Sequence, residues 1–218
     1  MIRVLFRLAP AAALLFAASA VLAAPPSGSL FAPRSTVTLD KEQRAQLEKI
    51  NAYFNSITNL SGKFVQVGPD GSKTEGEFYM SKPGKVRFEY NDPSPIELIS
   101  DGSAVAVRDR RLATQDIYPL SQTPLRFLLS DKLDLMKDAN VVNVYSDDLF
   151  MTVVIEEKSL LAGTNRLMIM FGTKDHQLKQ WTVTDPQGYD TTVAVSDLDS
   201  TKKPDPKLFK IQYESVLK

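Results

Sequence analysis

The chain shows two different spacings of hydrophobic residues, and each predicts its own kind of element. Within residues 41–57 the apolar side chains lie three or four positions apart, which is the spacing that lines one side of an α-helix. Asp40 stands three residues before Gln43, the pattern of a capping box at the start of a helix. We expect this helix to pack on a sheet through Leu47, Ile50, Phe54 and Ile57.

From Gly62 onward apolar and polar residues alternate, as in β-strands that bury one face. Turn sequences such as Gly68-Pro69-Asp70-Gly71 separate the short segments. The predicted strands are residues 63–67, 74–80, 85–90, 96–100, 103–108, 112–117, 141–145, 149–156, 166–171, 178–184, 189–197 and 208–213. Their regular spacing favours a mainly β (α+β) fold, in which one antiparallel sheet curls into a barrel or an incomplete barrel.

A short second helix is predicted between the two groups of strands, within residues 121–130. Thr123 can cap such a helix, and Pro124 suits its first position. Leu125, Leu128 and Leu129 then fall on one face. This helix either covers an open end of the sheet or fills the core, and the pattern is compatible with both.

The N-terminus has the pattern of a secretory signal peptide. Arg3 and Arg7 precede a short apolar run at residues 8–20, and Val21 and Ala23 supply small residues at the −3 and −1 positions. We therefore expect cleavage after Ala23 and a periplasmic protein. An uncleaved membrane anchor is the alternative, although the apolar run is barely long enough to span a bilayer.

The sequence thus divides into a signal peptide at residues 1–23, a flexible lead at 24–39 and one folded domain at 40–218. The lead is rich in proline, serine and threonine and lacks periodicity. Because the chain has no cysteine, a lipid anchor attached through a cysteine is excluded, as are disulfides, cysteine-ligated metals and thiol catalysis.

Charge and titratable residues indicate neither a nucleic-acid-binding protein nor an enzyme. Lysine and arginine (26) balance aspartate and glutamate (26), so no basic surface is expected. The one histidine, His176, lies in a polar turn without a nucleophile motif nearby, and we expect an exposed turn residue. The pairs Asp147-Asp148 and Asp197/Asp199 lack a calcium-binding pattern. We expect no catalytic residue, metal or cofactor.

The predicted strands carry many large, soft apolar side chains, which are typical either of an adaptable cavity or of a plain core. The candidates for a cavity lining are Phe64, Phe78, Met80, Val86, Phe88, Tyr90, Ile96, Leu98, Met151, Met168 and Met170.

Several segments, in order and at matching spacing, resemble the LolA family of lipoprotein carriers. They are Gly62-Lys63-Phe64-Val65-Gln66, the run from Gly76 to Phe88, Ser100-Asp101-Gly102, the run from Tyr118 to Leu125, and, as the family's closing strands, Thr184-Asp185-Pro186-Gln187-Gly188-Tyr189 and Leu208-Phe209-Lys210. The resemblance implies an incomplete antiparallel β-barrel with helices over an apolar cavity. It also implies a carrier without cofactor, and we expect a monomer because a shuttle is most simply a monomer. Such a carrier takes acylated lipoproteins from an inner-membrane ABC transporter to an outer-membrane acceptor.

The resemblance also implies a lid and a clamp for it. The lid would be formed by Leu125, Phe127, Leu128 and Leu129. Lys82 stands where the family typically has an arginine that ties the sheet to the lid. We predict that Lys82 contacts the end of the lid helix, less firmly than the forked arginine would. A carrier of other lipids and a lipoprotein-sensing regulator of similar fold are alternative functions.

Overall fold

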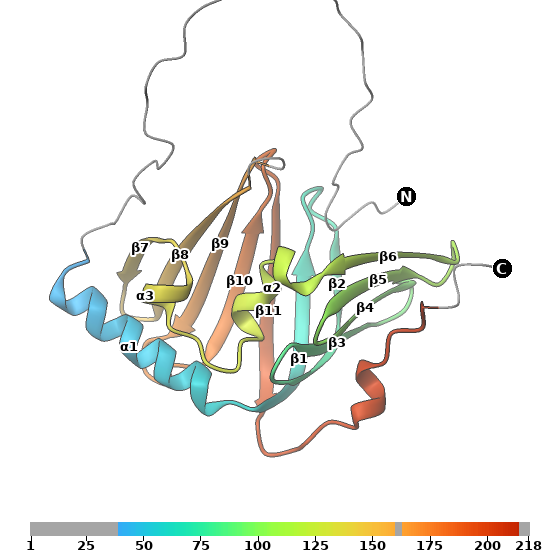
Figure 1. Cartoon of the computed structure of the whole chain (residues 1–218), viewed down its shortest axis with the longest axis horizontal. Helices are drawn as coiled ribbons and strands as arrows, with labels where there is room; N and C mark the ends of the chain where they lie inside the picture. The colour runs from blue at the N-terminus through green and yellow to red at the C-terminus, as the bar shows by residue number, and fades with distance from the viewer. Residues whose placement is uncertain (1–38, 160–162, 214–218) are drawn as a thin grey trace, which may run out of the picture.

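The computed structural model describes residues 39–159 and 163–213. Within these residues, eleven antiparallel strands form one sheet in the order β6-β5-β4-β3-β2-β1-β11-β10-β9-β8-β7. The strands are β1 (Asn59–Val67), β2 (Lys73–Ser81), β3 (Lys85–Tyr90), β4 (Ile96–Asp101), β5 (Ala104–Asp109), β6 (Thr114–Pro119), β7 (Val141–Ser146), β8 (Phe150–Ser159), β9 (Gly163–Gly172), β10 (Leu178–Thr184) and β11 (Asp190–Asp199). The sheet curls but does not close, since β6 and β7 stay at its two edges (Figure 1).

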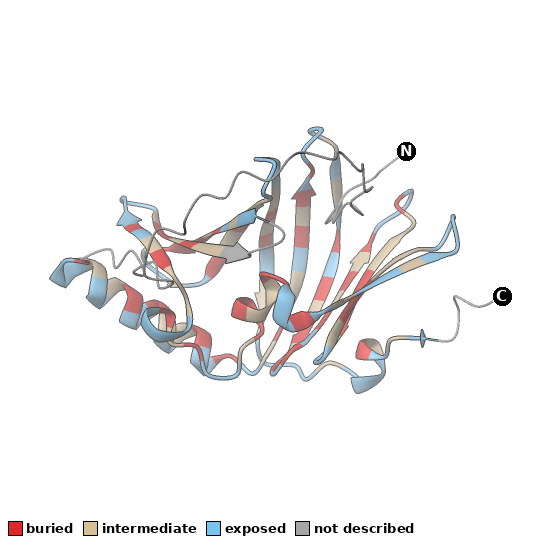
Figure 2. Cartoon of the chain, turned by 45° about the horizontal axis from the view of Figure 1, so that its top comes forward, coloured by how far each residue is buried: buried red, intermediate tan, exposed pale blue. Residues whose placement is uncertain are grey.

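The helices lie in the concavity of this half-barrel. α1 (Lys41–Ser56) runs along one end, α2 (Leu125–Leu128) sits between the two halves of the sheet, and α3 (Leu135–Asp138) lies on the β7–β8 side next to α1 (Figure 1). Buried and exposed residues alternate along many strands, because one face of the sheet meets the helices and the other faces outward (Figure 2). The predicted fold class is confirmed: the fold is an open half-barrel rather than a closed barrel.

The helix predicted from the capping box is present. The Asp40 side chain accepts the Gln43 backbone N–H at 2.8 Å, and the Gln43 side chain accepts the Asp40 N–H at 2.9 Å. The helix ends at Ser56, one residue earlier than predicted, and Ile57 is its C-cap. The helix packs on the sheet through buried Leu47, Ile50 and Phe54.

α1 also holds the segment that follows α2. Asn55 donates to the Leu133 carbonyl at 3.0 Å and accepts the Leu133 N–H at 2.8 Å, and Asn51 accepts the Leu135 N–H at 3.2 Å. These side chains satisfy backbone groups of an irregular segment that would otherwise be buried without partners.

One predicted strand is wrong. Residues 208–213 do not join the sheet, and η2 (Pro206–Phe209) is a 3₁₀ helix instead. The Asp205 side chain accepts the Lys207 N–H, which starts a turn, and the Leu208 carbonyl accepts a hydrogen bond from Arg87 at 3.2 Å. Phe209 is buried, although it lies outside the cluster that packs between sheet and helices.

The predicted edge strand at residues 112–117 begins later, at Thr114. The Asp109 carboxylate accepts the N–H groups of Arg111 and Leu112, so these residues belong to the turn. The predicted signal peptide and most of the predicted lead lie outside the described residues. Leu39, the last residue of that lead, is buried. Among the described residues, no helix has both the length and the apolar character needed to cross a membrane.

Candidate functional site: an apolar cavity under a short helix

A small apolar cavity lies between the concave face of the sheet, the end of α1 and α2. Its volume is about 30 Å³, so it has room for little more than a water molecule. The side chains that line it are apolar except for the Tyr53 hydroxyl and the Trp181 indole N–H. The lining residues are Tyr53, Phe54, Ile57, Leu60, Phe78, Met80, Val86, Phe88, Leu125, Leu128, Leu129, Leu178 and Trp181.

The Tyr53 hydroxyl is satisfied within the wall of the cavity. It accepts the backbone N–H of Leu178 at 3.3 Å. A tyrosine hydroxyl is neutral at physiological pH, and burial raises the pKa of Tyr53 further above its ordinary value. The cavity therefore presents apolar surface without a charged group among its lining residues, and it is suited to hydrocarbon rather than to a polar ligand.

Aromatic rings from several strands build the floor of the cavity. Phe88 is stacked on Phe78 with ring centroids 5.8 Å apart, and it meets Phe64 and Trp181 edge to face at 5.1 and 6.2 Å. Edge-to-face and offset pairs of this kind add to the stability that comes from burial alone. This half of the floor is therefore firmly packed.

The predicted second helix is α2, and it covers the cavity. Leu128 and Leu129 are buried and Leu125 is half-buried, and all three line the cavity from above. Phe127 is buried too, but it lines a separate open groove of about 450 Å³ between α2, the segment that follows it and the β2–β3 and β4–β5 turns. The sequence left open whether this helix covers the sheet or fills the core. The same three leucines do both, because they cover the cavity and pack into the core. We call α2 with Leu129 the lid.

The prediction for the start of this helix is wrong in detail. Pro124 occupies the N-cap position rather than the first helical position, and no side chain caps the helix. The Thr123 hydroxyl donates instead to the Leu120 carbonyl at 2.9 Å. That carbonyl belongs to η1 (Leu120–Gln122), the 3₁₀ turn that precedes the lid. Because the Thr123 hydroxyl bonds to this carbonyl three residues earlier, it does not cap α2.

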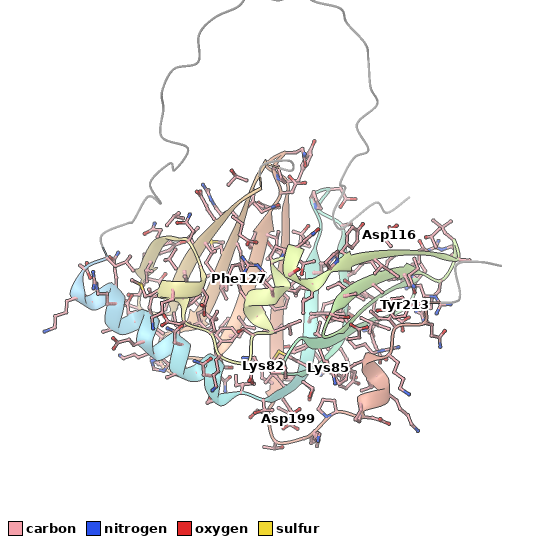
Figure 3. All side chains as sticks on the ribbon, viewed as in Figure 1. Lys82, Lys85, Asp116, Phe127, Asp199 and Tyr213 are labelled. Carbon is pink, nitrogen blue, oxygen red and sulfur yellow. The ribbon has the colours of Figure 1, made fainter. Side chains whose placement is uncertain are left out.

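Lys82 holds a different helix from the one we predicted. Its Nζ donates to the Phe54 carbonyl at 2.6 Å and lies 4.8 Å from the centroid of the Phe54 ring (Figure 3). Lys82 therefore ties the β2–β3 turn to the last turn of α1, while the lid carbonyl of Leu129 accepts the backbone N–H of Gly84 at 2.9 Å. Burial lowers the pKa of Lys82 to about 8, against an opposing effect of Asp131.

Gly84 can make this contact because it has no side chain. Its φ is +75°, and a Cβ atom built on it would lie 2.7 Å from the Cα of Gly102 in the β4–β5 turn. Its carbonyl also accepts a hydrogen bond from the buried Ser100 hydroxyl at 2.6 Å. Two turns at this end of the sheet thus pack closely enough for backbone to reach the lid.

The predicted lining residues divide into three groups. Four of them, Phe78, Met80, Val86 and Phe88, line the cavity. A second group is in the same core but outside this cavity; Phe64, Tyr90, Leu98 and Met151 are buried there and Ile96 is partly buried. The third group, Met168 and Met170, lies on the opposite face of the sheet from the cavity.

Met168 and Met170 lie on the convex side of the sheet. Their neighbours in β9, Leu167, Ile169 and Phe171, are the buried residues that face the helices. The Met168 sulfur accepts a hydrogen bond from the Tyr145 hydroxyl, and the Met170 sulfur accepts one from the Gln180 amide. Methionine can lie on either face of a sheet, so residue type alone led us to assign Met168 and Met170 to the wrong face.

Sequence analysis missed Tyr53, Leu60, Leu178 and Trp181 as lining residues. Leu178 and Trp181 are three positions apart, and simple alternation would place them on opposite faces. The register between β9 and β10 shifts between Leu178 and Gln180, which brings both side chains to the concave side. A bulge of this kind leaves no signal in an apolar pattern.

The titratable residues singled out by sequence do not form a site. His176 lies in the β9–β10 turn with φ +56° and is half-buried rather than exposed, and its Nε2 is enclosed without a hydrogen-bond partner. Asp147 accepts the N–H groups of its own turn, and Asp197 pairs with Lys63 at 2.8 Å. The described residues contain no group of three or more metal-binding side chains.

Sequence comparisons with known proteins match this chain to lipoprotein carriers of one family. A family model described as outer membrane lipoprotein carrier protein LolA matches residues 55–212. The outer-membrane lipoprotein carrier protein of Alkalilimnicola ehrlichii is 34% identical over 87 residues, which are 38% of this chain and 41% of that protein. Its counterpart in Chromohalobacter salexigens is 27% identical over 177 residues, covering 76% of this chain and 83% of that protein.

Among solved structures, a LolA superfamily protein from Nitrosomonas europaea is similar over 78% of this chain and 97% of that one. The sequence identity is 12% and the TM-score is 0.39. A structural likeness of this degree is too weak to carry weight beside the family match.

Proposed function

Because this chain belongs to the LolA family of outer-membrane lipoprotein carriers, we propose that it binds the acyl chains of lipoproteins and carries them through the periplasm. The observation that supports this most is the apolar cavity closed by the leucines of the lid. A carrier of this kind is not an enzyme and needs no cofactor.

The energetics of acyl chains explain why a carrier is needed. Exposing one chain of about sixteen carbons to water costs roughly 13 kcal/mol, at about 0.8 kcal/mol per methylene. The closed cavity of about 30 Å³ cannot hold such a chain, so the lid must move for cargo to enter. When the cargo leaves, the lid leucines cover the apolar wall again, and this offsets part of the cost of release.

We propose three further features that follow from this role. The N-terminal segment would direct the chain to the periplasm and be removed after Ala23. An inner-membrane ABC transporter would supply the lipoprotein, and an outer-membrane acceptor would receive it. The carrier domain at residues 40–218 would act as a monomer, with Lys82 and Gly84 holding the closed arrangement of helices at the β2–β3 turn.

A release assay tests the proposal. Protein beginning at Ala24 is added to spheroplasts that make a labelled outer-membrane lipoprotein, and the supernatant is examined for a soluble complex. We expect the complex with the wild-type protein and its loss with Phe88→Glu, which places a charge in the cavity floor. Leu125→Gln, at a half-buried lid position, serves as a second variant if Phe88→Glu does not fold.

The alternatives give different results in this assay. A supernatant without lipoprotein, together with phospholipid that co-purifies with the protein, would favour a periplasmic lipid-binding or transfer protein. If the supernatant is then mixed with isolated outer membranes, a complex that never passes its cargo to them would favour a lipoprotein-sensing regulator. Normal release by a folded Phe88→Glu variant would contradict binding in this cavity.

A further inference from the structure

The lid is held at two points on opposite walls of the half-barrel. At its C-terminal end, the Leu129 carbonyl accepts the Gly84 N–H at the β2–β3 turn. Near its start, Arg126 forms an ion pair with Glu157 of β8. In the described sheet, five strands stand between β3 and β8, so the two contacts lie across the concavity from each other with α2 between them (Figure 1).

The position of Glu157 in β8 makes this pair a contact with the lid. Buried Ile155 faces the helices, and Glu157, two residues further along the strand, faces the same way. Glu156 points to the other face and pairs there with Arg166 at 2.8 Å. Two neighbouring glutamates therefore make two similar ion pairs, of which only that of Glu157 reaches the lid.

The surroundings of Arg126 strengthen its pair with Glu157. The Arg126 guanidinium lies 3.9 Å from the centroid of the Phe127 ring, and Phe127 is buried (Figure 3). The Arg126 and Glu157 side chains are 34% and 28% exposed. Partial burial reduces the screening of the two charges by solvent, and contact with the ring restricts the guanidinium before the pair forms. We therefore expect this pair to contribute toward the upper end of the range for the stability of surface ion pairs.

We propose that Arg126 and Glu157 are positioning residues that hold the lid closed on the β8 side and so set how often it opens. The proposal rests on the proposed function only in that an opening lid is what admits cargo. Movement of α2 away from the cavity separates Arg126 from Glu157, whereas the Gly84 contact belongs to the opposite wall. Loss of the ion pair should therefore raise the population of the open lid.

Hydrogen exchange of the lid amides tests this without any ligand. The Phe127 and Leu129 N–H groups donate to the Pro124 and Leu125 carbonyls, so their protection reports on the closed lid. We expect Glu157→Gln to lower their protection about three- to fivefold, the size expected for one half-buried pair. Glu156→Gln is the matched control, since it removes the Arg166 pair on the other face, and it should leave the lid amides unchanged.

Two more measurements separate a charge effect from a packing effect. About 1 M salt should lower lid protection in the wild-type protein but not in Glu157→Gln, because salt screens the pair. The double variant Arg126→Glu/Glu157→Arg should recover much of the lost protection. Equal protection in Glu157→Gln and Glu156→Gln would overturn the proposal. If lid exchange behaves as expected but the release assay yields no lipoprotein complex, the role of the Arg126–Glu157 pair stands and the proposed function fails.

Discussion

The Lys82 ammonium group lies 2.6 Å from the backbone carbonyl oxygen of Phe54, in a place where the lysine is only 7% exposed. This carbonyl belongs to the last turn of α1, where it also accepts the backbone N–H of the C-cap residue Ile57 at 3.3 Å and where a positive charge is favoured by the helix dipole. The β2–β3 turn thus reaches α1 through a side chain and the lid through the backbone of Gly84.

The first prediction concerns the pH dependence of stability at Lys82. Its pKa is about 8 in the folded protein, against about 10.4 in an unfolded chain. Below pH 8 both states carry the charge, and the folded state bears the full cost of burying it. Between about pH 8 and 10.5 the folded state loses the proton first, so wild type should gain roughly 2–3 kcal/mol relative to Lys82→Met.

Urea unfolding of wild type and Lys82→Met at about pH 7, 9 and 10.5 measures this difference. Other groups titrate equally in both proteins, so their effects cancel in the comparison. A difference in unfolding free energy that stays constant over this range would show that the Lys82 ammonium is not destabilised by its site.

The second prediction compares two glycines with positive φ. Gly71→Ala introduces strain alone, because nothing lies within 4 Å of the added Cβ, and should cost about 1 kcal/mol. Gly84→Ala adds a clash with the Gly102 backbone and should cost about 2–4 kcal/mol. It should also lower the exchange protection of the Leu129 amide. Equal costs for the two variants would mean that the close approach of the two turns is not required.

The third prediction uses two methionines on opposite faces of the sheet. Met80→Gln places an amide in the cavity wall, and we expect it to weaken binding of the uncharged dye Nile red about tenfold. Met170→Gln makes the same change on the convex face and should alter the affinity less than twofold. Fluorescence titration of both variants gives the answer, and a larger effect from Met170→Gln would place the binding surface on the convex side.

The fourth prediction separates stability from binding. Phe209 is 4% exposed, and η2 contacts β3 and β4 outside the main core. Phe209→Ala should lower the unfolding free energy by about 2–4 kcal/mol while leaving Nile red affinity unchanged. Tyr213→Phe removes only the hydroxyl bond to Asp101 and should cost about 1 kcal/mol or less. Altered dye binding in Phe209→Ala would mean that the C-terminal segment also supports the cavity.

Local signals allowed much of this fold to be predicted. The capping box of Asp40 and Gln43 placed α1 to within one residue, because both partners lie in the same turn. Alternation and turn residues located eleven of the twelve predicted strands, β3 and β10 with the observed bounds and the other nine with shifted ends. The twelfth failed because Asp205 and Pro206 favour a 3₁₀ turn and because Arg87, far away in sequence, binds the Leu208 carbonyl.

The site was harder to predict because it depends on which face of a strand each side chain lies on and on which distant residue a long side chain contacts. Phe78 follows Glu77, and Phe88 stands between Arg87 and Glu89, so the face of both rings could be inferred. Met168 and Met170 have no such neighbours to decide their face, and the bulge near Leu178 hid Trp181. Which helix Lys82 holds is decided by the position of Phe54 in the folded chain, and sequence spacing contains no information about that.

Trp181, the single tryptophan of the chain, provides the most direct test of the central claim. Its side chain is buried in the cavity wall beside Phe88. A synthetic triacylated lipopeptide with brominated acyl chains would be titrated into the protein, because bromine quenches tryptophan emission only at close range. We predict strong quenching of Trp181, and little change with the same lipopeptide lacking bromine. Lipopeptide that binds tightly without bromine-dependent quenching would show that the acyl chains lie elsewhere, and would contradict the account.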